Sequence, residues 1–197
     1  MNDKSAEAGN TTPKQMVAKQ MTRSISLLLV SFCMLFIPAI DATANDKPRP
    51  YEEIYPEIGY TTVEEALEEF EQHFKRKLKL PTRVPPIRFT HHFGRFSNLD
   101  GDMNDSFEVT FIHDQLSENH YKINVRPVKY NIPIREQHVL KTFELKNGAL
   151  ATYTNFAGFN VLVFERNGWQ YMFSIDKRVA DKVTPETLVD IANSIEN

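Results

Sequence analysis

Between residues 106 and 127 the chain alternates apolar and polar side chains with a period of two. In SFEVTFIHD, three apolar side chains share one side of an extended strand: Phe107, Val109 and Phe111. The intervening Glu108 and Thr110 fall on the other side, and HYKINVRPV repeats the pattern. Because successive side chains of a strand point to opposite faces, the pattern predicts a sheet with one dry and one solvated face.

Further strands are predicted on either side of this region. IRFTHHFGRF, from Ile87, precedes it, and two hairpins follow it, with turns at Asn147-Gly148 and Asn167-Gly168. Asn-Gly suits a type I′ turn, whose two central residues both need positive φ. FNVLVF is apolar on both faces, which places it centrally in the sheet with cover on each side. Together the runs predict an antiparallel sheet of about six or seven strands.

An amphipathic helix is predicted at each end of the strand region. TTVEEALEEFEQHFKRKLKL offers a capping box at Thr61 or Thr62 and is stopped by Pro81. Its apolar stripe consists of Val63, Ala66, Leu67, Phe70, Phe74 and Leu78. In VTPETLVDIANSIEN, Thr184 is the expected N-cap before Pro185. We therefore predict an α+β fold, with the antiparallel sheet packed against an N-terminal and a C-terminal amphipathic helix.

The first 44 residues are typical of an export leader. Residues 24–40, SISLLLVSFCMLFIPAI, carry no charge and follow a segment that contains Lys14, Lys19 and Arg23. Ala42 and Ala44 then form an A-x-A arrangement, which predicts cleavage between Ala44 and Asn45. An uncleaved signal anchor is the alternative, since 17 apolar residues are about the shortest length that spans a bilayer. Translation could start at Met1, Met16 or Met21; in every case the rest of the chain is expected outside the cytoplasm.

The remaining chain divides into a linker and one domain. Residues 45–59 are rich in proline and are interpreted as an extended linker, and residues 60–197 as the exported α+β domain. Cys33, the one cysteine, lies in the leader. The exported part therefore has no thiols for a disulfide framework or an iron–sulfur cluster. A net charge of -3 without a basic block argues against nucleic acid as a partner.

Candidate chemistry is sparse. DGDMND, residues 100–105, resembles a calcium loop, but an EF-hand needs glycine at its sixth position, where Asp105 stands. A hairpin turn is the better interpretation. No serine or cysteine nucleophile motif and no phosphate-binding glycine loop occurs, so we predict no catalytic residues and no cofactor. The alternative is a metal-binding protein or metal-dependent hydrolase that uses a histidine cluster: His91 or His92, with His113 and His120.

The tryptophan strand poses the choice between core and ligand platform. Trp169, Tyr171, Phe173 and Ile175 share one face of the strand after Gly168. Four large apolar groups in register favour packing beneath a helix. The aromatic content would still permit a partly open groove between sheet and helix.

The order of these segments resembles an uncharacterised family of exported domains in Gram-positive bacteria. The resemblance rests on YTTVEEALEEF, LKLPTRVPP, LKNGALATY, LVFERNGWQYMFSI and TPETLVDIANSI, and spans residues 60–195. Members resembling this chain occur as secreted proteins, lipoproteins and extracytoplasmic parts of membrane-bound regulators, including anti-sigma-like proteins. The resemblance implies no activity and no catalytic residues. This chain departs from it in lacking a lipobox and in having only 23 residues before the apolar run, too few for a sigma-binding domain.

These observations favour a non-enzymatic exported cell-envelope domain that acts by binding. The expected partner is an envelope protein, a peptide or a lipid, with membrane contact through the N-terminal segment if it is not cleaved. A structural protein of the spore or wall is a third possibility.

Overall fold

The computed structural model describes residues 48–99 and 102–196. Residues 49–197 form one compact unit. The predicted leader, with its apolar segment and the cleavage residues Ala42, Ala44 and Asn45, lies outside the described residues. Within the described ranges, no helix is both long and apolar enough to cross a bilayer.

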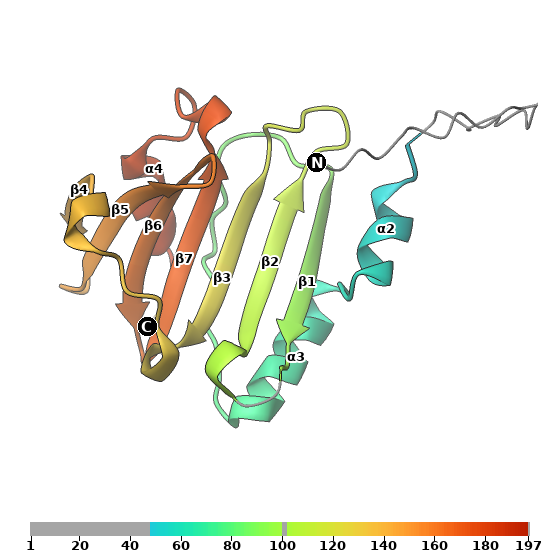
Figure 1. Cartoon of the computed structure of the whole chain (residues 1–197), viewed down its shortest axis with the longest axis horizontal. Helices are drawn as coiled ribbons and strands as arrows, with labels where there is room; N and C mark the ends of the chain where they lie inside the picture. The colour runs from blue at the N-terminus through green and yellow to red at the C-terminus, as the bar shows by residue number, and fades with distance from the viewer. Residues whose placement is uncertain (1–47, 100–101, 197) are drawn as a thin grey trace, which may run out of the picture. The chain divides into compact units, whose positions relative to one another are not determined.

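Seven antiparallel strands form a single sheet, in the order β1-β2-β3-β7-β6-β5-β4 (Figure 1). Their bounds are β1 His91–Ser97, β2 Ser106–Ile112, β3 Tyr121–Pro127, β4 Lys141–Glu144, β5 Leu150–Phe156, β6 Phe159–Arg166 and β7 Trp169–Asp176. In the described part of the chain, three helices accompany the sheet: α2 Tyr51–Glu57, α3 Val63–Phe74 and α4 Pro185–Ala192. The α+β class and the seven-stranded antiparallel sheet agree with the sequence prediction. FNVLVF forms β6, which is paired on both sides and buried on both faces, as predicted.

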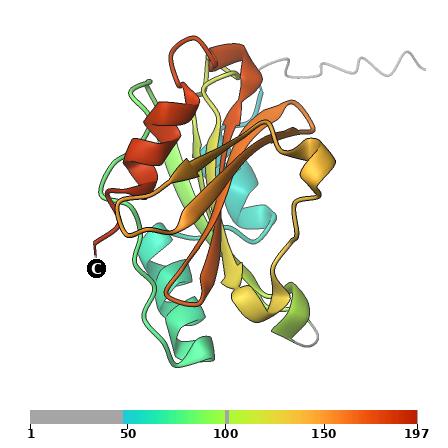
Figure 2. The same cartoon turned by 90° about the vertical axis from the view of Figure 1, so that its left-hand side faces the viewer.

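One face of the sheet, here called the helix face, is covered by α3 and α4 (Figure 2). Phe70 of α3 and Leu188 of α4 pack into one core with Phe107 of β2 and Phe173 of β7. The segment after α3 crosses the same face, because the Tyr171 hydroxyl donates to the Lys79 carbonyl at 2.9 Å. The helix face is therefore the dry core of the molecule.

The opposite face is covered differently. Residues 128–140, here called the strap, run over β7, β6 and β5 as an irregular segment with two short 3-10 turns (Figure 2). Near β1 this face, here called the strap face, contacts α2 instead, where the Tyr55 ring stacks on Phe93 with centroids 4.4 Å apart. The face predicted to be solvated is thus partly covered, by the strap over β7, β6 and β5 and by α2 near β1.

The α3 helix begins as predicted but ends early. Thr62, not Thr61, forms the capping box, with the Glu65 backbone N–H donating to its hydroxyl at 3.2 Å. The prediction that Pro81 stops the helix is wrong, because Lys75 adopts the left-handed conformation with φ 50° and ends it six residues earlier. The Glu71 carboxylate then accepts the Leu78 N–H at 2.8 Å, which turns the chain back so that Leu78 is still buried.

Residues 45–59 are not simply an extended linker. Positions 51–57 form α2, and the aromatic side chains of this helix pack on the domain. The prediction of a linker rested on the prolines and did not consider these aromatic residues. The strand predicted from Ile87 likewise starts only at His91. Thr90 immediately precedes that strand and its backbone N–H still donates to the Ile112 carbonyl at 2.9 Å.

The two Asn-Gly turns differ. Asn167 and Gly168 both have positive φ, 50° and 69°, which matches the predicted type I′ turn. At Asn147-Gly148 the glycine alone has positive φ, so that turn is not type I′. Its loop has three residues, between Leu145 and Ala149, and a three-residue loop favours a type I turn closed by a left-handed glycine.

Candidate functional site: a groove beneath the strap

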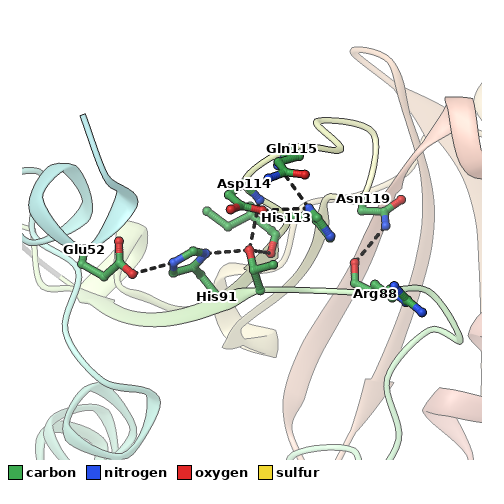
Figure 3. Close-up of polar contacts among 9 residues, drawn as sticks. Glu52, Arg88, His91, His113, Asp114, Gln115 and Asn119 are labelled. Atoms are coloured by element: carbon green, nitrogen blue, oxygen red, sulfur yellow. Dashed lines mark hydrogen bonds and ion pairs between the residues drawn. The ribbon is translucent and has the colours of Figure 1, made fainter. Parts of the chain in front are cut away.

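The four histidines of the predicted cluster do not gather at one site. His91 points towards Glu52 of α2, whereas His113 Nδ1 accepts the Gln115 backbone N–H at 3.1 Å (Figure 3). His92 points to the helix face and stacks on Phe111, and His120 lies on the strap face, 3.3 Å from the Thr110 hydroxyl. Within residues 48–99 and 102–196, no three His, Cys, Asp or Glu side chains come close enough to hold a metal ion.

The His91 ring instead joins α2 to the sheet. Its Nε2 lies 2.8 Å from Glu52 Oε1, and its Nδ1 lies 2.7 Å from the Thr90 hydroxyl (Figure 3). A carboxylate, an imidazole and a hydroxyl in series are the donor set of a nucleophilic triad. Here, however, the Thr90 oxygen also accepts the Asp114 backbone N–H at 3.0 Å, and Glu52 is exposed. These hydrogen bonds therefore hold α2, β1 and the β2–β3 connection together.

In the described part of the calcium-like loop, the Asp105 side chain makes contacts within the protein. Asp100 and Gly101 lie outside the described residues. Asp105 is 1% exposed, and its two oxygens lie 2.8 Å from the Leu99 N–H and 3.0 Å from His73 Nε2. Its carboxylate therefore closes the loop and ties it to α3.

Trp169 is a core residue. Its side chain is 2% exposed, and its ring packs against Phe70 and Phe74 with centroids 5.0 and 5.4 Å away. The Arg76 guanidinium covers the ring at 4.8 Å, and the indole N–H donates to the Lys77 carbonyl at 3.4 Å. The prediction of core over ligand platform is confirmed. A groove lies on the strap face of the sheet.

That groove lies between the strap and strands β3, β7, β6 and β5, and has a volume of about 870 Å³. Its apolar floor and walls include Met172 of β7, Val161 of β6 and, at the β5–β6 turn, Phe156 and Phe159. Ile134 of the strap faces them from above. The Phe156 side chain is 76% exposed, although the other apolar side chains of this set are more buried.

The strap is fixed at both ends. The Gln170 side-chain amide binds both backbone groups of Ile132: the Ile132 N–H donates to its Oε1 at 2.8 Å, and its Nε2 donates to the Ile132 carbonyl at 3.0 Å. At the far end the Thr154 hydroxyl donates to the His138 carbonyl at 2.7 Å, and the Leu140 N–H donates to the Tyr153 carbonyl at 2.9 Å. The intervening residues roof the groove.

Polar side chains cluster at the β3 end of the groove. His120, Lys122 and Ser174 line it there, and Lys122 faces Ser174 across the β3–β7 ladder. Burial, and after it the neighbouring Lys122 charge, lowers the pKa of His120, so its ring is neutral near pH 7. Lys122 Nζ lies 3.1 Å from Glu108 Oε1. A partly apolar groove with a few convergent polar groups is the usual form of a small-ligand site.

The sequence carried a weak signal for this groove that period-two patterning did not use. NIPIREQ places Ile132 and Ile134 in an otherwise polar stretch, and Val161 and Phe159 share the strap face with Met172. Apolar residues on both faces of β6 did predict cover on both sides, but not that one cover would leave a groove.

Comparison with known protein families, curated proteins and solved structures finds no match for this chain. The resemblance to an exported Gram-positive family therefore stays a prediction.

Proposed function

We propose that this chain is a non-enzymatic, exported cell-envelope protein, and that its folded domain binds the apolar part of a small amphiphilic ligand in the groove beneath the strap. The observation that carries the proposal is the groove itself, whose volume of about 870 Å³ falls within the range of about 300–1,000 Å³ found for small-ligand pockets. Export rests on the apolar run and the A-x-A site at Ala42 and Ala44. We also propose that one amphipathic helix packs on the sheet at each end of the domain.

The pairing of the floor strands favours a side-chain-bound ligand over an added strand. β3, β7 and β6 have hydrogen-bonded neighbours on both sides, and β5 is paired with β4 at residues 150–153. Only the last three residues of β5 would therefore offer a peptide a free backbone edge, which is short for β-strand addition. Apolar contact with Met172, Val161 and Phe156 would supply most of the binding free energy.

Binding of a neutral solvatochromic dye, Nile red, to purified 45–197 tests this proposal. We expect a blue-shifted, saturable signal, and about tenfold weaker binding for Phe156→Ser, because that ring forms one groove wall. Met103→Ser is the matched control, since Met103 is 64% exposed and lies in the β1–β2 connection. Equal binding by both variants, or no saturable binding by the parent, would contradict the groove as the binding site.

The metal-dependent alternative is tested by elemental analysis of the same purified protein. We expect less than one metal ion per chain, because His91, His92 and His120 point to separate surroundings. One equivalent of a transition metal retained through dialysis would reinstate the alternative.

A further inference from the structure

Building on the proposed function, we infer that the ligand is a free fatty acid, whose carboxylate lies at the polar β3 end of the groove. Its hydrocarbon chain would extend over Val161 and Met172 towards Phe156. The inference rests on the charge of the groove and on its size.

The charges that line the groove have one sign. Its ionisable lining residues are His120, Lys122, Arg135 and His138, and no carboxylate lines it. Arg135 is exposed on the strap, and no ion pair to it occurs within the described residues. A groove with cationic and neutral polar groups complements an anionic head group and disfavours a cationic one.

The cation at the polar end of the groove is held in place by a neighbouring carboxylate. Arg95 of β1 and Lys122 of β3 lie on either side of Glu108 of β2. The Glu108 carboxylate also accepts the Tyr60 hydroxyl and lies 3.8 Å from Arg95. Glu108 thus positions Lys122 beside the groove without itself lining it.

The size of the groove selects a free single-chain acid over a membrane surface. A groove of about 870 Å³ has room for one small ligand. Its roof is the strap, fixed by Gln170 at one end and Thr154 at the other, so a bilayer headgroup would have to leave its membrane to enter.

Displacement of Nile red from 45–197 by three detergents of equal chain length tests the inference. The competitors are decanoate, decyl maltoside and decyltrimethylammonium, each below its critical micelle concentration at pH 7.5. We expect decanoate to displace the dye at about tenfold lower concentration than decyltrimethylammonium, with decyl maltoside between them. Lys122→Met should remove most of that preference and Lys122→Arg should retain it, when each displacement is normalised to the variant's own affinity for Nile red.

The outcomes separate this inference from the proposal on which it rests. Equal displacement by all three competitors would overturn the fatty acid and leave the apolar groove intact. Failure of Nile red to bind saturably would refute the groove itself. Binding of the protein to phosphatidylglycerol vesicles without displacement by decanoate would overturn the free acid in favour of a lipid surface.

Discussion

The two faces of the sheet bury apolar side chains by different means, and the phenylalanines show the difference. On the helix face Phe70 is 0% exposed and contacts the rings of Phe74, Phe96, Phe107 and Trp169. On the strap face Phe156 is 76% exposed, at the rim of the groove. Regular helices present a continuous apolar stripe that fills the space above a sheet, whereas an irregular segment touches it at a few fixed points. The helix face therefore stabilises the fold, and the strap face leaves an open groove.

The same substitution on each face gives the largest contrast. Phe70→Ala should lower the free energy of unfolding by about 3–5 kcal/mol, because it opens a cavity among packed rings. Phe156→Ala should change it by less than about 0.5 kcal/mol, because the ring is already in water. Urea unfolding followed by Trp169 fluorescence measures both. Similar losses for the two variants would remove the distinction between the faces.

Close packing on the helix face can be tested at one glycine. A Cβ on Gly94 would lie 2.7 Å from the Thr62 carbonyl oxygen and 2.7 Å from Val63 Cα, both backbone atoms at the start of α3. Gly94→Ala should therefore cost about 1–3 kcal/mol of unfolding free energy. Ser97→Ala, on the same strand, should cost much less. A neutral Gly94→Ala would show that α3 can move away from β1.

On the strap face, the Gln170 amide is the corresponding fixed point. Gln170→Ala removes two hydrogen bonds to Ile132 and should cost about 1–2 kcal/mol. It should also speed tryptic cleavage after Arg135, because the strap loses its anchor on the sheet. Gln137→Ala, on the exposed part of the strap, should leave the cleavage rate unchanged. Unaltered proteolysis of Gln170→Ala would mean that the strap is held by other contacts.

The groove rim contains backbone strain that a substitution should relieve. Ala157 has φ 46° in the β5–β6 turn, a conformation that asparagine adopts more readily than alanine. Ala157→Asn would recreate the Asn-Gly pair of residues 167–168 and should raise the free energy of unfolding by about 0.5 kcal/mol. Asn167→Ala is the reciprocal test and should lower it. A loss of stability in Ala157→Asn would indicate that the rim needs the smaller side chain.

The smallest expected effect is a pH dependence at the polar end of the groove. Burial lowers the pKa of His120, and Lys122 and Arg178 lower it further, while Asp176 and Glu108 oppose this. Below the unfolded pKa of about 6.5, the unfolded chain binds the proton more readily than the folded one. The free energy of unfolding should therefore fall as the pH drops below about 6.5, and less so in His120→Gln. Urea midpoints at pH 7.5 and 5 measure the difference; parallel changes in both proteins would exclude His120 as the cause.

The sequence predicted the helix face well, because that face obeys local rules. The stripe that contains Phe70, the Thr184 cap with Pro185, and the alternation around Val109 each follow from a fixed periodicity or a local hydrogen bond. The Asn167-Gly168 turn is local in the same sense.

The strap face could not be predicted in this way. The strap is held by bonds between residues far apart in sequence, such as Gln170 with Ile132, and no periodic pattern records them. The helix α2 was missed because proline at position 56 obscured a short aromatic helix that packs on Phe93. The alternation of β1 sends His91 and His92 to opposite faces, so only one of them could be grouped with His113 and His120. The sequence did not indicate that His91 would instead pair with Glu52 of α2. Groove and strap both depend on such long-range contacts.

The pairing of the Gln170 amide with the Ile132 backbone also bears on how this surface could diversify. The Gln170 side chain makes the two backbone hydrogen bonds that a neighbouring strand would otherwise make. The strap is therefore joined to the sheet at single residues and not along a strand ladder. The turn that follows bonds within itself, with the His138 N–H donating to the Arg135 carbonyl at 2.8 Å. Insertions or exchanges between positions 133 and 137 would therefore leave every strand pair intact. The sequence of this segment can therefore change to suit a different ligand while the sheet beneath it keeps its structure.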